Sequence, residues 1–132
     1  MLTAAAVALA AFSAFGFAKE IKVTLSGAEE VPPVTTSASG SGTVVINDDR
    51  SVSVSVTTTG IVGTGAHIHE GAPGTNGPVI VPFAKAGDNG WTAAPGAKLT
   101  DSQFESFKAG NLYVNVHSAA NKGGEIRGQL KP

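Results

Sequence analysis

This 132-residue chain contains three histidines and no cysteine. Imidazole nitrogens, and no thiolates, are therefore the ligands that it can offer a transition-metal ion. Two of the histidines, His67 and His69, flank Ile68. If this segment is a strand, both imidazoles lie on one face, about 7 Å apart at Cα. A pair held on one backbone loses little further freedom on binding. The spacing therefore favours joint binding of one metal ion over two solvated side chains.

His117 belongs to a second alternating segment. The apolar residues at 112, 114 and 116 form a stripe there, and His117 lies on the opposite, polar face. All three imidazoles therefore point away from the apolar stripes of their strands, and they converge if the two strands are neighbours in one sheet. Three imidazoles without a thiolate suit copper or zinc. We predict a copper-type ion at His67, His69 and His117, with zinc as the less favoured cofactor.

Polar residues near the histidines would support such a site. Asn115 and Glu125 are candidate acceptors for imidazole N–H groups. Bound copper would serve redox chemistry on a small oxidant such as superoxide, or storage and delivery of the ion. A zinc ion with an open position would instead activate water for hydrolysis. That reaction needs a general base, for which the sequence offers Glu70 and Glu125.

The composition excludes several other classes of function. Nine basic residues stand against ten acidic ones, so the net charge of −1 provides no electrostatic footprint for nucleic acid. The absence of cysteine excludes disulfides, thiolate metal sites and cysteine nucleophiles. The stability of the fold must then come from packing, from backbone pairing or from a bound metal.

The first 18 residues differ from the rest of the chain. They carry no charged side chain, and Gly16 and Ala18 are the small residues expected at a signal-peptide cleavage site. We predict a signal peptide over residues 1–18, and one domain over residues 19–132 in the periplasm or outside the cell, free of the membrane after cleavage. No Lys or Arg precedes the apolar run, so an uncleaved membrane anchor is the alternative.

Apolar residues alternate with polar ones in most of the remaining chain, which is typical of strands. The predicted strands cover residues 21–25, 43–46, 52–57, 66–69, 79–81, 112–117 and 126–130. The polar turn at 47–49 predicts a hairpin, and Pro78 and Pro82 place the strand between them near a sheet edge. Residues 27–42, 71–78 and 84–97 are predicted loops. These elements indicate an all-β, antiparallel, Greek-key-like sandwich or barrel.

One short helix is predicted at residues 101–109. Thr100 and Gln103 have the spacing of a capping box, and Ser102 and Glu105 have it as well. Two phenylalanines, at 104 and 107, would share one face, and Gly110 would end the helix.

Three blocks of the chain resemble the CHRD domain, which is named for chordin. The blocks are residues 25–34 (LSGAEEVPPV), residues 66–72 (AHIHEGA) with 76–79 (NGPV), and residues 112–118 (LYVNVHS) with 123–128 (GGEIRG). The resemblance extends over residues 22–130 and implies an exported or extracellular domain. In chordin the domain belongs to a protein that binds a signalling factor. The resemblance thus implies an alternative function, a non-enzymatic adhesion or protein-interaction module. The predicted edge near Pro78 and Pro82 would then accept a partner strand, and the histidines would hydrogen-bond the loop at 71–78.

The histidine motifs also resemble those of copper–zinc superoxide dismutases. By this likeness His67, His69 and His117 match copper ligands, and Arg127 matches the arginine that guides the anion. The bridging histidine, the zinc ligands and the disulfide of that family have no counterparts here. The likeness therefore implies a copper-only site at most. The alternative for Arg127 is an exposed strand residue that pairs with Glu125.

Overall fold

The computed structural model describes residues 18–132, so the predicted signal peptide lies outside the described residues except for Ala18. The strands are β1 (Ala18–Ser26), β2 (Ser39–Asn47), β3 (Val52–Thr59), β4 (Gly63–Glu70), β5 (Val79–Lys85), β6 (Gly90–Ala93), β7 (Leu112–Ser118) and β8 (Ile126–Gln129). The 3₁₀ helix η1 (Gly27–Glu29) follows β1, and the α-helix α2 (Asp101–Lys108) precedes β7. Within residues 18–132, no helix has the length and apolar character needed to cross a membrane.

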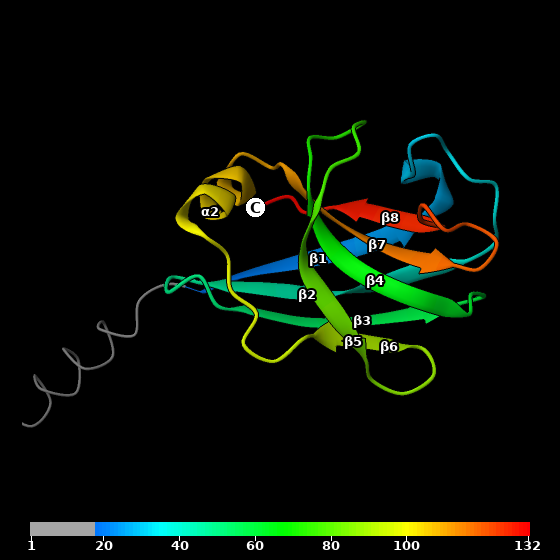
Figure 1. Cartoon of the computed structure of the whole chain (residues 1–132), viewed down its shortest axis with the longest axis horizontal. Helices are drawn as coiled ribbons and strands as arrows, with labels where there is room; N and C mark the ends of the chain where they lie inside the picture. Colours follow the sequence, from blue (N-terminus) through cyan, green and yellow to red (C-terminus); the bar gives the residue numbers. More distant parts are fainter. Residues whose placement is uncertain (1–17) are drawn as a thin grey trace, which may run out of the picture.

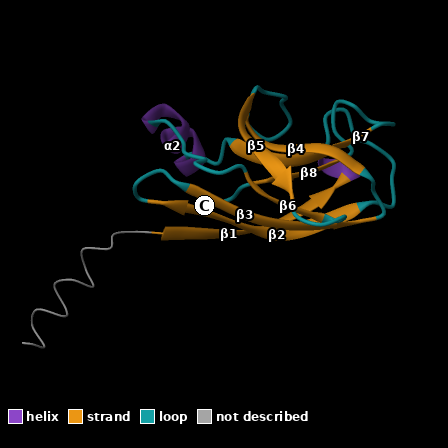
Figure 2. Ribbon diagram, turned by 60° about the horizontal axis from the view of Figure 1, so that its bottom comes forward, coloured by secondary structure: helices purple, strands orange, loops and turns teal. Residues whose placement is uncertain are grey.

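The eight strands form one closed antiparallel barrel in the order β1-β2-β3-β6-β5-β4-β7-β8 (Figure 1). Strands β4, β5 and β6 follow one another as neighbours. The chain then passes through α2 and returns as β7 beside β4, which is a Greek key. Helix α2 lies at one end of the barrel and η1 at the other (Figure 2). The predicted all-β barrel with one short helix is confirmed.

In the first strands of the barrel, alternating apolar and polar residues determine which side chains face the interior and which face solvent. In β3, Val52, Val54 and Val56 are buried, whereas the serines between them are exposed. The predicted hairpin joins β2 to β3, and the Asn47 N–H donates to the Ser51 carbonyl at 3.0 Å. The interior is filled by aliphatic side chains from seven of the strands, by Trp91 of β6, and by Phe104 and Phe107 of α2. Inward-facing residues of β4 and β7 belong to this core, so the opposite faces of these two strands lie outside the barrel.

Two details of the predicted strands are wrong. Strand β5 is not at an edge, because β4 pairs with one side of it and β6 with the other. Proline is tolerated there because β6 pairs only with residues 83–85, so Pro82 lies beside the end of β6. The Pro82 carbonyl accepts a hydrogen bond from the Ala94 N–H at 3.1 Å. Two of the predicted loops are too long, because 84–97 contains β6 and 27–42 contains the start of β2. A strand-adding partner therefore has no open edge at β5.

Helix α2 begins as predicted and ends one residue earlier, at Lys108. The Thr100 hydroxyl accepts from the Gln103 N–H at 3.1 Å, the Gln103 side chain accepts from the Thr100 N–H at 2.9 Å, and Gly110 follows with a φ of 81°. Phe104 and Phe107 form the buried face. The capping box is thus the one at Thr100, and not the one at Ser102.

Replacing Thr100 by alanine removes the side-chain acceptor for the first turn of α2. We expect the free energy of unfolding to fall by about 1 kcal/mol, as for other N-cap threonines. Urea unfolding followed by circular dichroism measures the change. Ser102→Ala is the matched control and should leave the stability within about 0.5 kcal/mol of the wild type. Equal losses in the two variants would contradict the assignment of the cap.

Candidate metal centre

Pairing between β4 and β7 brings the three histidines together. In the register of the two strands, Gly65 lies opposite His117, His67 opposite Asn115, and His69 opposite Tyr113. Ala66 and Ile68 face the core, as do Val114 and Val116 on the neighbouring strand. The histidines therefore share the outer face of the barrel, as their alternation predicts. His69 is nevertheless buried, because the loop at 71–78 folds back over this face.

The imidazoles are close enough to bind one ion. The ring centroid of His67 lies 5.6 Å from that of His69 and 5.0 Å from that of His117. The centroids of His69 and His117 are 6.0 Å apart. One ligand nitrogen from each ring lies within 4.8 Å of the others. Points so placed all lie within about 2.8 Å of a common centre, so shifts of less than about 1 Å bring each nitrogen to the 2.0–2.1 Å of a metal–nitrogen bond. The geometry fits a three-histidine metal site.

Backbone carbonyls determine which nitrogen of two rings is free. Nδ1 of His69 lies 2.9 Å from the Gly77 carbonyl oxygen, and Nδ1 of His117 lies 2.8 Å from that of Lys122. A carbonyl only accepts, so each Nδ1 carries the proton and each Nε2 is a bare acceptor. These two Nε2 atoms and Nδ1 of His67 are buried and have no hydrogen-bond partner. Each ring thus keeps one nitrogen free for a metal.

Burial lowers the pKa of two of the three rings and so favours their neutral forms. Burial lowers the pKa of His67, and the neighbouring His117 and His69 lower it further. Burial also lowers the pKa of His69, more than its hydrogen bond to the Gly77 carbonyl raises it. Neutral imidazole is the form that binds metal ions, so little proton competition is expected at neutral pH.

Tyr113 and Arg127 form a stack behind His69. The Tyr113 ring lies parallel to the His69 ring, with an interplanar angle of 3° and a centroid distance of 4.7 Å. The Arg127 guanidinium lies 3.5 Å from the centroid of the Tyr113 ring. The Tyr113 hydroxyl also accepts from the Gly77 N–H at 3.0 Å. The stack and the loop together hold the His69 ring in place.

Arg127 does not occupy the exposed position that anion guidance requires, because its side chain is only 2% exposed. Its guanidinium donates to the Asn76 side chain and the Ala72 carbonyl, both at 3.3 Å, and to the Gln129 side chain at 3.4 Å. It does not pair with Glu125 either. Its contacts with Asn76 and Ala72 connect the 71–78 segment to β8.

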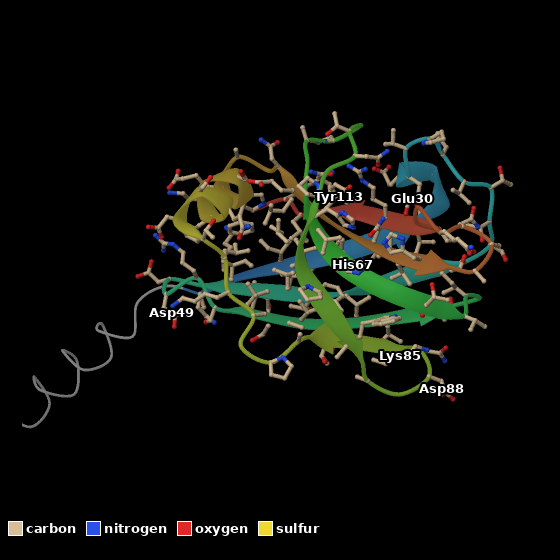
Figure 3. All side chains as sticks on the ribbon, viewed as in Figure 1. Glu30, Asp49, His67, Lys85, Asp88 and Tyr113 are labelled. Atoms are coloured by element: carbon tan, nitrogen blue, oxygen red, sulfur yellow. The ribbon has the colours of Figure 1, made fainter. Side chains whose placement is uncertain are left out.

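Asn115 lies beside the histidines, and next to it lies a carboxyl group that the sequence analysis did not identify. Asn115 is 2% exposed and Glu30, just after η1, is 4% exposed. Burial raises the pKa of Glu30 to about 7, against the lowering effects of the Arg127 charge and of a hydrogen bond from Asn115. In Figure 3 the labelled Glu30, His67 and Tyr113 lie in one region, over β4, β7 and β8.

The two candidate general bases have other partners. Glu125 accepts hydrogen bonds from Ser118 at 2.6 Å and from Thr36 at 2.7 Å, which lower its pKa. Glu70 accepts from the Ser106 hydroxyl on α2. The imidazole N–H groups of His69 and His117 donate to backbone carbonyls. Glu125 and Asn115, which were the predicted acceptors, do not accept from them.

Sequence reasoning also missed Gly77, Lys122 and Tyr113 as supports of the histidines. The Gly/Pro-rich loop directly after His69 was a signal for the first, since such a loop can fold back onto the strand that it leaves. The predicted hydrogen bond between a histidine and this loop exists at Gly77. It does not exclude metal binding, because it occupies Nδ1 and leaves Nε2 free.

Comparison with known proteins agrees with the three blocks of sequence described above. The family model for the CHRD domain matches residues 21–130, which is most of the chain and nearly all of the barrel. Comparisons with curated proteins and with solved structures gave no match. The matched range contains all three histidines, Glu30, Asn115 and Arg127. The chain belongs to the CHRD domain family.

Proposed function

We propose that this protein is an exported CHRD-domain protein that binds one copper-type ion through His67, His69 and His117. The observation that carries the proposal is the set of three buried imidazole nitrogens with no hydrogen-bond partner, gathered on one face of β4 and β7. A buried acceptor left without a donor costs about 1–3 kcal/mol. A cation bound between these nitrogens satisfies all three at once.

The donor set supports copper over other ions. Imidazole suits copper and zinc, and copper(II) binds a given nitrogen site more tightly than zinc does. The chain has no cysteine to provide a competing thiolate site. Zinc is the second candidate ion, and a comparison of the two affinities decides between them.

The enclosure of the site supports storage or delivery of copper ahead of turnover. Each of the three free nitrogens has less than 1 Å² of exposed surface, whereas a redox enzyme for a small oxidant such as superoxide needs an open position on its metal. A superoxide dismutase assay on the copper-loaded protein tests the redox alternative. Activity that disappears in His67→Ala would place catalysis ahead of storage.

The proposed location is the periplasm or the outside of the cell. CHRD domains occur in extracellular and secreted proteins. Fractionation of producing cells, with antibody detection and mass spectrometry of the N-terminus, tests both the location and the proposed cleavage after Ala18.

Titration of the metal-free protein with Cu²⁺ and Cu⁺ tests the copper site. The wild type should bind one equivalent tightly, and His67→Ala should lose at least about 100-fold in affinity, since even the loss of a group that supports a ligand costs 10–100-fold. Thr64→Ala, an exposed residue on the same strand, is the matched control and should bind like the wild type. Weak or non-stoichiometric binding, or unchanged binding by His67→Ala, would overturn the proposal.

A further inference from the structure

The ligand set of the histidine site extends beyond nitrogen. We propose that the side-chain carbonyl of Asn115 is a fourth ligand to the bound ion, and that Glu30 is a positioning residue that orients the Asn115 amide. This inference rests on the proposed copper site and specifies which oxidation state that site prefers.

The first support is the distribution of unpartnered groups. Among residues 18–132, five buried side-chain polar atoms have no hydrogen-bond partner. Three are the free histidine nitrogens, and the other two are Oδ1 of Asn115 and Oε2 of Glu30. Unsatisfied buried groups are rare in folded proteins. Their concentration around β4 and β7 indicates that one absent partner serves several of them.

The second support is the position of Asn115 among the histidines. Asn115 lies opposite His67 in the β4–β7 register and two residues before His117 on β7, so its side chain is on the same outer face as the imidazoles. Its Oδ1 is buried there without a partner, as are the three free nitrogens. Bare acceptors gathered on one face are an arrangement that a cation between them stabilises.

Glu30 accounts for the orientation of the Asn115 amide. Asn115 Nδ2 and Glu30 Oε2 both lie beside Gly124, since a Cβ at this glycine would be 2.5 Å from each of them. The amide Nδ2 is a donor and a carboxyl oxygen is an acceptor. With Nδ2 on the Glu30 side, Oδ1 is turned to the histidines.

The chemistry of the fourth ligand predicts a preference. An amide oxygen is a hard donor that suits divalent ions, whereas Cu⁺ is satisfied by softer ligands. Asn115 should therefore strengthen the binding of Cu²⁺ and leave that of Cu⁺ nearly unchanged. A tenfold effect confined to Cu²⁺ raises the reduction potential of the variant by about 59 mV.

Paired affinities for Cu²⁺ and Cu⁺ test this inference. We expect Asn115→Ala to lose about 10–100-fold for Cu²⁺ and less than about twofold for Cu⁺. Asn115→Asp keeps an oxygen at the same place and should retain tight Cu²⁺ binding. Glu30→Ala should lose Cu²⁺ affinity as well, whereas Glu29→Ala, its exposed neighbour, should not. Electron paramagnetic resonance of the Cu²⁺ forms should change in Asn115→Ala and not in Glu29→Ala.

Equal losses for both oxidation states, or no loss in Asn115→Ala, would overturn the role of Asn115. Unchanged Cu²⁺ binding by Glu30→Ala would overturn that of Glu30. If Asn115→Ala does not fold, loss of Cu²⁺ binding by a folded Asn115→Asp overturns the inference. Failure of the copper site itself is recognised separately, because the wild type would then bind no stoichiometric copper.

Discussion

Replacing Arg127 by methionine destabilises the protein at both pH 5 and pH 8, and by up to about 1.4 kcal/mol more at pH 8, because Glu30, with a pKa of about 7, takes up a proton when its counter-charge is lost. Glu30 is a buried carboxyl group whose pKa the Arg127 charge lowers. Without the guanidinium, an ionised Glu30 has no compensating charge. Methionine preserves most of the length that packs on Tyr113. The hydrogen bonds that it loses to Asn76 and Ala72 cost the same at both pH values, so the difference between the two pH values isolates the electrostatic part.

The pH dependence follows from the pKa of Glu30, which is about 7 in the folded protein and 4.5 as the ordinary value. Between these values the folded state holds a proton that the unfolded state has released. The stability contributed by protonated Glu30 is therefore complete below pH 4.5 and is lost as the pH rises through 7. Loss of Arg127 raises this pKa further, which makes the decline steeper at pH 8 and leaves the contribution of Glu30 at pH 5 little affected.

Urea unfolding of the variant and the wild type at pH 5 and pH 8 measures both effects. Arg50→Met is the matched control, because the Asp101 partner of Arg50 is 93% exposed, and it should cost no more than about 1 kcal/mol at either pH. In a Glu30→Gln background, Arg127→Met should cost the same at the two pH values. A loss that is equal at the two pH values would show that Glu30 is not the group that Arg127 compensates.

Replacing Gly77 by alanine separates the loop at 71–78 from β4. A Cβ at this position would lie 1.7 Å from the Glu70 carbonyl oxygen and 2.8 Å from its carbon, and both are backbone atoms that cannot rotate away. The chain must shift, and it then loses the contacts of Gly77 with His69 and Tyr113. We expect a loss of stability on the order of 3 kcal/mol.

Copper affinity should fall together with the stability of Gly77→Ala, by about 10–100-fold, because the Gly77 carbonyl that orients the His69 ring moves. Thermal unfolding and copper titration of the same preparation measure both. Gly123→Ala, where an added Cβ has no neighbour within 4 Å, is the control beside the His117 loop and should behave like the wild type. If Gly77→Ala retains both stability and affinity, the loop does not support the site.

Alternation predicted the strands and the shared face of the histidines, because inside and outside are fixed by a period of two. It could not show that β4 pairs with β7, which depends on the long return through α2. The four-residue β6 was missed because Gly90 and the polar residues before it are typical of a turn. Two prolines suggested an edge at β5, yet Pro82 only needs the neighbouring strand to end beside it.

At the metal centre, the sequence predicts which side chains converge and not which nitrogen of each ring is free. That choice depends on the backbone carbonyls of Gly77 and Lys122. Because every residue has a carbonyl, the sequence does not distinguish the two that accept from the histidines. Glu30 is distant in the sequence and reaches the site only because β1 closes the barrel beside β8. Arg127 has the alternation of an exposed residue, but the loop at 71–78 covers it.

The closure of the barrel also governs when the domain can fold. Its seam joins β1, the first described strand, to β8, the last, through the pair Ser26 and Arg127. The cylinder therefore cannot close until residues 126–129 are available, so a chain still being synthesised or threaded through a translocation channel remains open. Contacts between such distant segments also slow folding. A fold that closes with its last strand is compatible with the proposed export, in which the chain crosses a membrane extended and acquires its structure on the other side.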